Sequence, residues 1–446
     1  MPISPARTAA FDILLRVEQE DSYASELLHS TRCAELAVPD QGLTTELVMG
    51  VLRWRSLLDA TIAKVASQPL ARLDREVLTA LRLGAYQLGW LDRVPARAAI
   101  HESVELVKRA RKRSAAPFTN AVLRKLTDTS ISSEARQELL ASATSPEALA
   151  TSSAHPSWLV QRWASQYGLE MARHICIYNQ SVPITSIRLR APSAEEELRR
   201  DGIKISAGSF LRDARRIVAG DVTKTKAFTE GRVVIQDEAS QLVAAIVGQG
   251  KRVLDCCAAP GGKTWAICDR NPEGEVVAVE LHRHRAEILR KRVLAKNVRV
   301  TNADIRDLRA GQPFDRVLVD APCSGTGTIA RNPEIKWRLK AEDLGDLHGR
   351  QLAILQSAMK QVASSGRLIY STCSLEREEG EGVVEQAMQD NQSFQVLDLP
   401  YQLERLRADG EFVAQDVKSS YGPYLRTIPG VHLCDGFFVA MLQRIE

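Results

Sequence analysis

Two cysteines stand directly after predicted strands, where a thiol can reach a bound substrate. Cys323 follows the predicted strand 314–320, and Cys373 ends the predicted strand 367–371. Ligands of open α/β sheets bind at the carboxyl ends of the strands. A thiolate at this edge can add to carbon-6 of a cytosine, which makes carbon-5 nucleophilic enough to accept a methyl group. Asp320 ends the first of these strands and is placed to contact the nitrogen edge of such a base.

The stretch 253–264 predicts a cofactor site, because it combines a strand, a glycine-rich turn and the start of a helix. It is not a P-loop, since Cys257 stands where that motif requires its first glycine, and the G-x-G-x-x-G of dinucleotide sites is absent. S-adenosylmethionine carries no phosphates and fits a tight turn of this kind. The predicted cofactor contacts are Cys257, Ala258, Ala259, Pro260, Gly261, Gly262, Lys263, Glu280, Asp304 and Asp320.

Two of these carboxylates come from the strands that follow the turn. Glu280 ends the predicted strand 275–280, where an acid can bind ribose hydroxyls, and Asp304 follows the strand 298–301, where it can meet the adenine amino group. Either residue alone is as easily a solvated carboxylate of a loop. Because both lie at the ligand-binding edge beside a glycine-rich turn, we predict a binding role for both.

Strands and helices alternate from residue 231 onward. The predicted strands are 252–256, 275–280, 298–301, 314–320, 367–371, 394–397 and 436–442, and the predicted helices are 264–269, 282–296, 348–364 and 376–389. This alternation predicts a doubly wound parallel sheet. Seven strands, of which the last is hairpin-like, are typical of an α/β class I methyltransferase.

The first half of the chain predicts helices, with apolar residues at helical spacing through 6–126. We predict an all-α domain over 1–130, a linker with one weak helix over 131–154, a small α+β RNA-binding subdomain over 155–230 and the methyltransferase domain over 231–446. In the subdomain, a helix is expected to run to about residue 179 and a strand over 184–190. A basic run at 108–113, followed by Arg124 and Lys125, is either a solvated helix face or a surface that contacts phosphates.

The composition is that of an ordinary globular protein. The 446 residues carry a formal net charge of +4, so any nucleic-acid surface must be a local patch. No apolar run reaches the length of a signal peptide or a membrane span, which predicts a cytoplasmic protein with eight reduced cysteines. No C-x-x-C pair occurs, so no metal is expected, and nothing predicts more than a monomer. Buried apolar side chains are expected of Cys33, Cys176, Cys256, Cys268 and Cys434.

These motifs resemble those of the NOL/NOP/Sun family of RNA cytosine-5 methyltransferases, and most of all its RsmB/Fmu-type branch, which acts on 16S ribosomal RNA. The matching segments read QDEAS at 236–240, CAAPGGK at 257–263, DAPCSGTG at 320–327, PEIKW at 333–337, STCS at 371–374 and DGFF at 435–438. The N-terminal half resembles the NusB-like RNA-binding domain of that branch through AAIHE at 98–102 and NAVLR at 120–124.

The resemblance implies roles for the candidate residues. Cys373 would be the covalent nucleophile, and Cys323 would assist release of the methylated product. The turn 257–263 with Glu280, Asp304 and Asp320 would contact S-adenosylmethionine, with Asp320 also near the target base. Two departures stand out: Cys256 replaces a commoner aliphatic residue, and the stretch Ala-Arg-Asn at 330–332 replaces a more basic one, which weakens any claim about RNA binding there.

Two other functions stay open at this point. The first is a methyltransferase that acts on nitrogen, which would need no thiol; the cysteine in the DAPC turn at 320–323 favours carbon chemistry over it. The second is an RNA-binding factor that keeps a decayed methyltransferase fold, against which the intact turn, acids and cysteines argue. The fold alone does not decide, because doubly wound sheets host many chemistries.

Overall fold

The computed structural model describes residues 3–20, 22–127, 133–309, 311–414 and 420–445. Its contacts group the chain into two compact units. One unit comprises Met1–Val182 with Ile329–Arg338, and the other comprises Pro183–Thr328 with Leu339–Glu446. Among the described residues, no helix is long and apolar enough to cross a membrane.

The first unit is helical. Its helices are α1 (Pro5–Gln19), α2 (Ala24–Leu28), α3 (Thr31–Ala34), α4 (Val38–Val65), α5 (Arg75–Trp90), α6 (Ala96–Arg109), α7 (Ala116–Leu126), α8 (Ser133–Ala141), α9 (Pro146–Ser152), α10 (Ser157–Tyr167), α11 (Leu169–Gln180) and α17 (Ile335–Arg338). The helix α1 begins where Ser4 accepts a hydrogen bond from Arg7 N and a proline occupies the first turn. Phe11, Leu47 and Leu81 come together in a core with exposed fractions of 2% or less, as the helical spacing of apolar residues requires.

The segment 131–182 is more helical than predicted. Where the sequence predicts one weak helix, the described residues of 131–154 form both α8 and α9. The single helix predicted to about residue 179 is two helices, because Gly168 has a φ of +87° and ends α10 before α11 starts. The boundaries predicted at residues 130, 154 and 230 remain predictions.

The second unit begins with a small antiparallel sheet. Its strands are β1 (Ser186–Leu189), β2 (Lys204–Ala207), β3 (Ala214–Ala219) and β4 (Val233–Ile235), in the order β2-β3-β1-β4, and its short helices are α12 (Ala194–Arg200) and α13 (Lys226–Thr229). Ile187, Leu198 and Val233 form the centre of its own small core.

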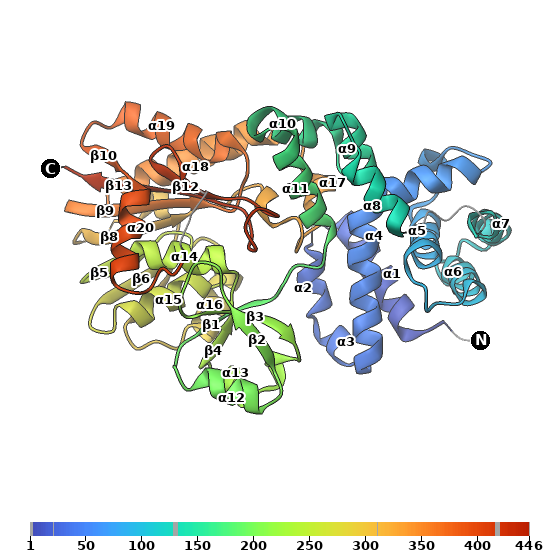
Figure 1. The fold of residues 1–446 in the computed structure, drawn as a ribbon, viewed down its shortest axis with the longest axis horizontal. Helices are drawn as coiled ribbons and strands as arrows, with labels where there is room; N and C mark the ends of the chain where they lie inside the picture. The colour runs from blue at the N-terminus through green and yellow to red at the C-terminus, as the bar shows by residue number, and fades with distance from the viewer. Residues whose placement is uncertain (1–2, 21, 128–132, 310, 415–419, 446) are drawn as a thin grey trace. The chain divides into compact units, whose positions relative to one another are not determined.

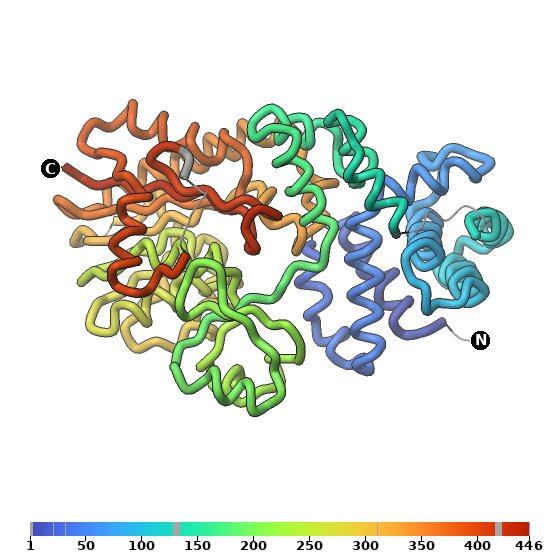
Figure 2. Tube along the Cα trace, in the orientation of Figure 1, coloured from blue at the N-terminus to red at the C-terminus, as the bar shows by residue number. Residues whose placement is uncertain are grey.

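The large sheet of the second unit has the order β11-β12-β13-β9-β8-β5-β6-β7, and β10 pairs with β13 as well. Its strands are β5 (Arg252–Asp255), β6 (Glu275–Glu280), β7 (Val298–Asn302), β8 (Phe314–Asp320), β9 (Val362–Thr372), β10 (Phe394–Leu397), β11 (Ser420–Tyr421), β12 (Tyr424–Thr427) and β13 (Phe437–Arg444). The strands from β7 to β9 are parallel, and β13 is antiparallel to β9. The chain starts this sheet at its middle strand β5, adds β6 and β7 on one side and then β8 and β9 on the other. The switch point, where such sheets bind ligands, therefore lies between β5 and β8. Figure 2 traces this part of the chain in colours that run from yellow-green at β5 to red at β13.

Helices cover both faces of the large sheet (Figure 1). They are α14 (Glu238–Val247), α15 (Gly262–Arg270), α16 (Arg283–Arg292) and α20 (Leu399–Ala408) on one face, and α18 (Asp343–Met359) and α19 (Glu381–Asp390) on the other. The class I methyltransferase sheet predicted from the sequence is thus present, and β11 and β12 extend it beyond the seven predicted strands.

Several predicted boundaries in this unit are wrong. The helix predicted over 282–296 ends at Arg292, and the helix predicted over 376–389 begins at Glu381. The helix predicted over 348–364 ends at Met359, and β9 begins at Val362, five residues before the predicted strand. The small and polar residues at 363–366 carry no clear strand pattern. Val362 pairs with Phe314 of β8 and Arg367 pairs with Arg316, so residues 363–366 form an irregularity of the strand between these two pairs.

Candidate active site

The turn between β5 and α15 is held in a shape that only glycine allows at one position. Gly261 has a φ of +105°, and a Cβ there would lie 2.7 Å from Leu289 Cδ1 of α16. Thr264 Oγ1 donates to the buried Asp255 carboxylate at 2.7 Å, which ties the start of α15 to the end of β5. The glycine therefore lets the predicted cofactor turn pack closely against α16 and fixes the path of the backbone into α15.

Glu280 lies at the end of β6, where the sequence predicts the ribose-binding acid. Its side chain is 5% exposed, and its two oxygens accept hydrogen bonds from Ala259 N at 3.3 Å and His282 N at 2.9 Å. Each oxygen keeps a further lone pair for a hydroxyl donor. Glu280 is thus joined directly to the predicted cofactor turn.

Asp304 lies just beyond β7, as predicted, but its carboxylate is engaged by a neighbour. The guanidinium of Arg306 donates to both Asp304 oxygens at 2.6–3.0 Å. These bonds hold the pKa of Asp304 below its usual range. Contact with an adenine amino group therefore requires Asp304 to use its remaining acceptor capacity or Arg306 to turn away.

Asp320 and Lys263 join the turn after β5 to the end of β8. Lys263 Nζ donates to Asp320 Oδ2 at 2.8 Å, and Ser371 Oγ donates to Oδ1 at 2.8 Å. Burial by itself would lower the pKa of Lys263, but Asp320 and, to a smaller extent, Cys373 raise it above its usual value. Lys263 is therefore a permanent cation at this edge of the sheet, next to a potential nucleophile.

The two predicted cysteines face each other across the ends of β8 and β9. The distance between Cys323 Sγ and Cys373 Sγ is 3.3 Å, and both residues are partly exposed. The neighbouring Cys373 sulfur and burial raise the pKa of Cys323 well above its usual value. Two thiols at this distance do not ionise together, and Cys323 is the one that its neighbour and burial keep protonated.

The sequence analysis missed two buried carboxyl groups of the site, Asp255 and Glu379. Burial raises the pKa of Asp255 to about 7. Glu379 is fully buried and accepts hydrogen bonds from the residues that follow both cysteines. Glu379 lies in a run of four acids within 376–381, which reads as a solvated helix start, so nothing in the sequence singles it out.

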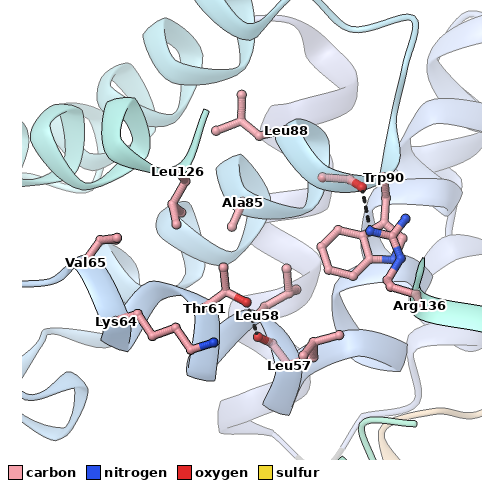
Figure 3. Close-up of a pocket in the computed structure, with 11 residues that line it drawn as sticks. Leu57, Leu58, Thr61, Lys64, Val65, Ala85, Leu88, Trp90, Leu126 and Arg136 are labelled. Atoms are coloured by element: carbon pink, nitrogen blue, oxygen red, sulfur yellow. Dashed lines mark hydrogen bonds between the residues drawn. The ribbon is translucent and has the colours of Figure 1, made fainter. Parts of the chain in front are cut away.

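One enclosed apolar cavity lies elsewhere, in the helical unit (Figure 3). It has a volume of about 320 Å³ and is lined mainly by Leu57, Leu58, Leu88, Trp90 and Leu126. It contains no cysteine and no carboxylate, so we place the site by its chemistry at the edge of the large sheet. Among the described residues, no group of three or more His, Cys, Asp and Glu is arranged to hold a metal ion.

The residues at this edge fit S-adenosylmethionine. Glu280 offers carboxylate oxygens to ribose hydroxyls, and its bond from Ala259 N places it directly beside the glycine turn. Lys263, by contrast, is occupied by Asp320 rather than free to bind a phosphate, which agrees with a ligand that has none.

Replacing Glu280 by glutamine is expected to weaken cofactor binding by about tenfold to about 100-fold, because one charged acceptor of the buried carboxylate is lost. Isothermal titration with S-adenosylmethionine measures the change. Glu287→Gln, on the exposed face of α16, is the matched control and should bind as the unmodified protein does. Equal affinity in Glu280→Gln would remove Glu280 from the cofactor site.

Comparisons with known proteins agree with this arrangement. Residues 245–443 match the family model described as 16S rRNA methyltransferase RsmB/F, and residues 4–128 match the NusB family. The chain is 34% identical to the probable ribosomal RNA small subunit methyltransferase B of Bacillus subtilis, over 100% of both chains. It is 32% identical to ribosomal RNA small subunit methyltransferase B of Pseudomonas syringae, over 93% of this chain and 92% of that one. A crystal structure of a methyltransferase homolog protein from Pyrococcus horikoshii has the same fold, with a TM-score of 0.57 and 22% identity over 68% of this chain and 99% of that one.

Proposed function

The chain belongs to the RsmB/F family of 16S rRNA methyltransferases, which use S-adenosylmethionine, and on that premise we propose that it methylates carbon-5 of a cytidine through a covalent cysteine adduct. The observation that carries the proposal is the pair of sulfur atoms, Cys323 Sγ and Cys373 Sγ, 3.3 Å apart beside Asp320 and Lys263. A methyltransferase that acts on an amino nitrogen needs no thiol nucleophile. A pair of thiols at the substrate-binding edge would have no role in such an enzyme.

Cys373 is the proposed nucleophile. Its thiolate forms a bond to carbon-6 of the cytosine, and the electron pair of the carbon-5–carbon-6 double bond moves onto carbon-5, which then bonds to the methyl group. The ammonium of Lys263 supplies the positive charge that favours a thiolate nearby, and Asp320 is the proposed partner of the nitrogen edge of the base. S-adenosylmethionine, when bound, supplies the methyl group that carbon-5 takes up. The target base must leave its stack to reach this edge.

Cys323 is the proposed acceptor of the carbon-5 proton, which must leave before the carbon–sulfur bond to Cys373 breaks. The largest cause that raises the pKa of Cys323 is the neighbouring Cys373 sulfur. Once that sulfur is bonded to carbon-6 it no longer carries charge, so Cys323 can lose its own proton to solvent. The resulting Cys323 thiolate then takes up the carbon-5 proton. Elimination of Cys373 then restores the aromatic ring and frees the methylated product.

Cofactor binding is proposed for the turn 257–263, for Glu280 and for Asp304, with Asp320 between cofactor and base. The turn, Glu280 and Asp320 are linked by hydrogen bonds to one another or to the cysteine-bearing strands, which supports this assignment. Asp304 differs from these residues, because the guanidinium of Arg306 already donates to its carboxylate and the cofactor would share it. An RNA-binding role is proposed for the NusB-like residues 4–128.

Nucleoside analysis tests the proposed function. The protein is incubated with unmethylated 16S ribosomal RNA and S-adenosylmethionine, the RNA is digested, and the methylated nucleoside is identified by chromatography and mass spectrometry. We expect 5-methylcytidine. A product methylated at the amino nitrogen of cytidine would contradict the proposal and would leave the family assignment standing.

The basic run at 108–113 gives a prediction about RNA binding. Three of its five cations are in ion pairs, Lys108 with Glu105, Arg109 with Asp12 and Lys112 with Asp74. When RNA binds, phosphates can replace these acids as partners of the cations. We therefore expect that neutralising all five cations lowers the steepness with which the RNA-binding constant falls with salt. The expected decrease in the slope of log K against log salt is about 0.7–0.9 per lost phosphate contact. The slope is measured by fluorescence titration with 16S RNA fragments. A slope equal to that of the unmodified protein would make the run a solvated helix face.

A further inference from the structure

We propose that Glu379 is a positioning residue that sets the separation between Cys323 and Cys373, and that this separation serves release of the product more than formation of the adduct. The inference rests on the proposed function and deepens it. Glu379 lies six residues after Cys373, between β9 and α19, and its side chain is fully buried.

Four donors converge on the two oxygens of Glu379. Oε1 accepts from Ser324 N and from Gln351 Nε2, each at 2.8 Å. Oε2 accepts from the hydroxyl of Ser324 and from Ser374 Oγ at 2.5 Å. Because Ser324 follows Cys323 and Ser374 follows Cys373, one carboxylate binds both of the turns that carry the sulfur atoms.

Further contacts make this cluster specific to the cysteine turns. The carbonyl oxygen of Glu379 accepts from Thr372 Oγ1 at 3.3 Å, so Glu379 holds the residues on both sides of Cys373. Gln351 also donates to Pro322 O at 2.9 Å, just before Cys323. Replacing Glu379 by alanine would leave the Ser324 amide without its acceptor and would remove the one carboxylate that binds both turns. The direct bonds between the turns, Ser324 Oγ with Ser374 Oγ at 3.2 Å and Gly327 N with Cys373 O at 2.9 Å, are expected to hold the two sulfur atoms less firmly by themselves.

The consequence for the reaction differs between its two halves. Attack on carbon-6 requires only that the Cys373 sulfur lies in contact with the cytosine. Loss of the carbon-5 proton and release of Cys373 need both sulfur atoms at the same base, 3.3 Å from each other. A change in their separation is therefore expected to slow release more than attack, so that covalent protein–RNA adduct accumulates.

The separation is measured first without RNA or cofactor. Diamide oxidises two neighbouring thiols to a disulfide, and its N=N bond takes up the two hydrogens. We expect Glu379→Ala to slow formation of the Cys323–Cys373 disulfide by on the order of tenfold. A displacement of reacting atoms by about 1 Å can change a reaction rate by up to about 10²-fold. Peptide mass mapping under non-reducing conditions follows the disulfide.

Two matched variants sharpen the result. Glu379→Gln is expected to restore most of the rate, since its amide oxygen can face Ser324 N and Gln351 while its NH₂ faces serine hydroxyls that turn to accept. Glu385→Ala removes the same charge from the exposed face of α19 and should leave the rate unchanged. If Glu379→Ala fails to fold, Glu379→Asp takes its place, with the same slowing expected from a side chain too short to bind both turns.

Denaturing electrophoresis with 16S RNA and S-adenosylmethionine is the second readout. We expect Glu379→Ala to accumulate adduct, with cofactor affinity unchanged by titration, as Cys323→Ala does in the neighbouring lane. A folded Glu379 variant that forms the disulfide at the wild-type rate would overturn the inference. A variant that forms it slowly and also loses cofactor binding would overturn it as well, because that result indicates a general structural defect. If Cys323→Ala itself gives no adduct, the proposed function fails, and the diamide rate still decides the role of Glu379.

Discussion

Replacing Cys373 by alanine is expected to lower methyl transfer to 16S RNA by about 10⁴-fold or more, with S-adenosylmethionine binding nearly unchanged. Cys373 directly follows β9, with its sulfur 3.3 Å from that of Cys323 and in the field of the Lys263 ammonium. Without this sulfur, carbon-5 of the base does not become electron-rich enough to take up a methyl group. Cofactor binding is expected to persist, because the predicted contacts at the turn 257–263 and Glu280 are untouched.

The measurement is transfer of labelled methyl groups to unmethylated 16S RNA, with calorimetric titration of the cofactor on the same protein. Cys268→Ala is the matched control, since this thiol is buried in α15 and acts as a small apolar side chain. That control should transfer methyl groups at the normal rate. Retained activity in Cys373→Ala would contradict the proposed chemistry.

Replacing Cys323 by alanine is expected to trap a protein–RNA complex that survives denaturation. Attack by Cys373 on carbon-6 does not need Cys323, whereas loss of the carbon-5 proton does, so the adduct forms and fails to resolve. We expect turnover to fall by about 10²- to 10⁴-fold, the usual contribution of a general base. Denaturing electrophoresis of the variant with 16S RNA and S-adenosylmethionine shows the complex as a band of lower mobility.

The double variant Cys323→Ala with Cys373→Ala is the control for this experiment, and its band should be absent. A band in the double variant would assign the bond to another nucleophile. A band that appears with Cys373→Ala alone and not with Cys323→Ala would reverse the two roles. No band in either variant would contradict the proposed covalent mechanism, even if the unmodified protein still made 5-methylcytidine.

Much of the site was predictable because the residues that do chemistry follow strands in the sequence. Parallel strands end at one edge, so Glu280, Asp320, Cys323 and Cys373 had to meet there once the sheet was predicted. Sequence also sufficed for the glycine turn, since the φ of +105° at Gly261 suits no other residue type. Local patterns of this kind act over a few residues and need no partner from elsewhere in the chain.

The tertiary structure alone decided which charged groups are paired and buried. Whether Lys263 faces a ligand or Asp320, and whether Asp304 is free or engaged by Arg306, depends on side chains that the fold brings together. Glu379 is one acid in an acidic run, and only packing distinguishes it from its exposed neighbours. The same holds for the segment Ile329–Arg338, which follows the Cys323 turn in the chain and yet packs with the helices, where Lys336 donates to Arg53 O and Ala154 O. Periodicity records which face of an element is apolar, and it contains no information on which distant polar group will satisfy a buried one.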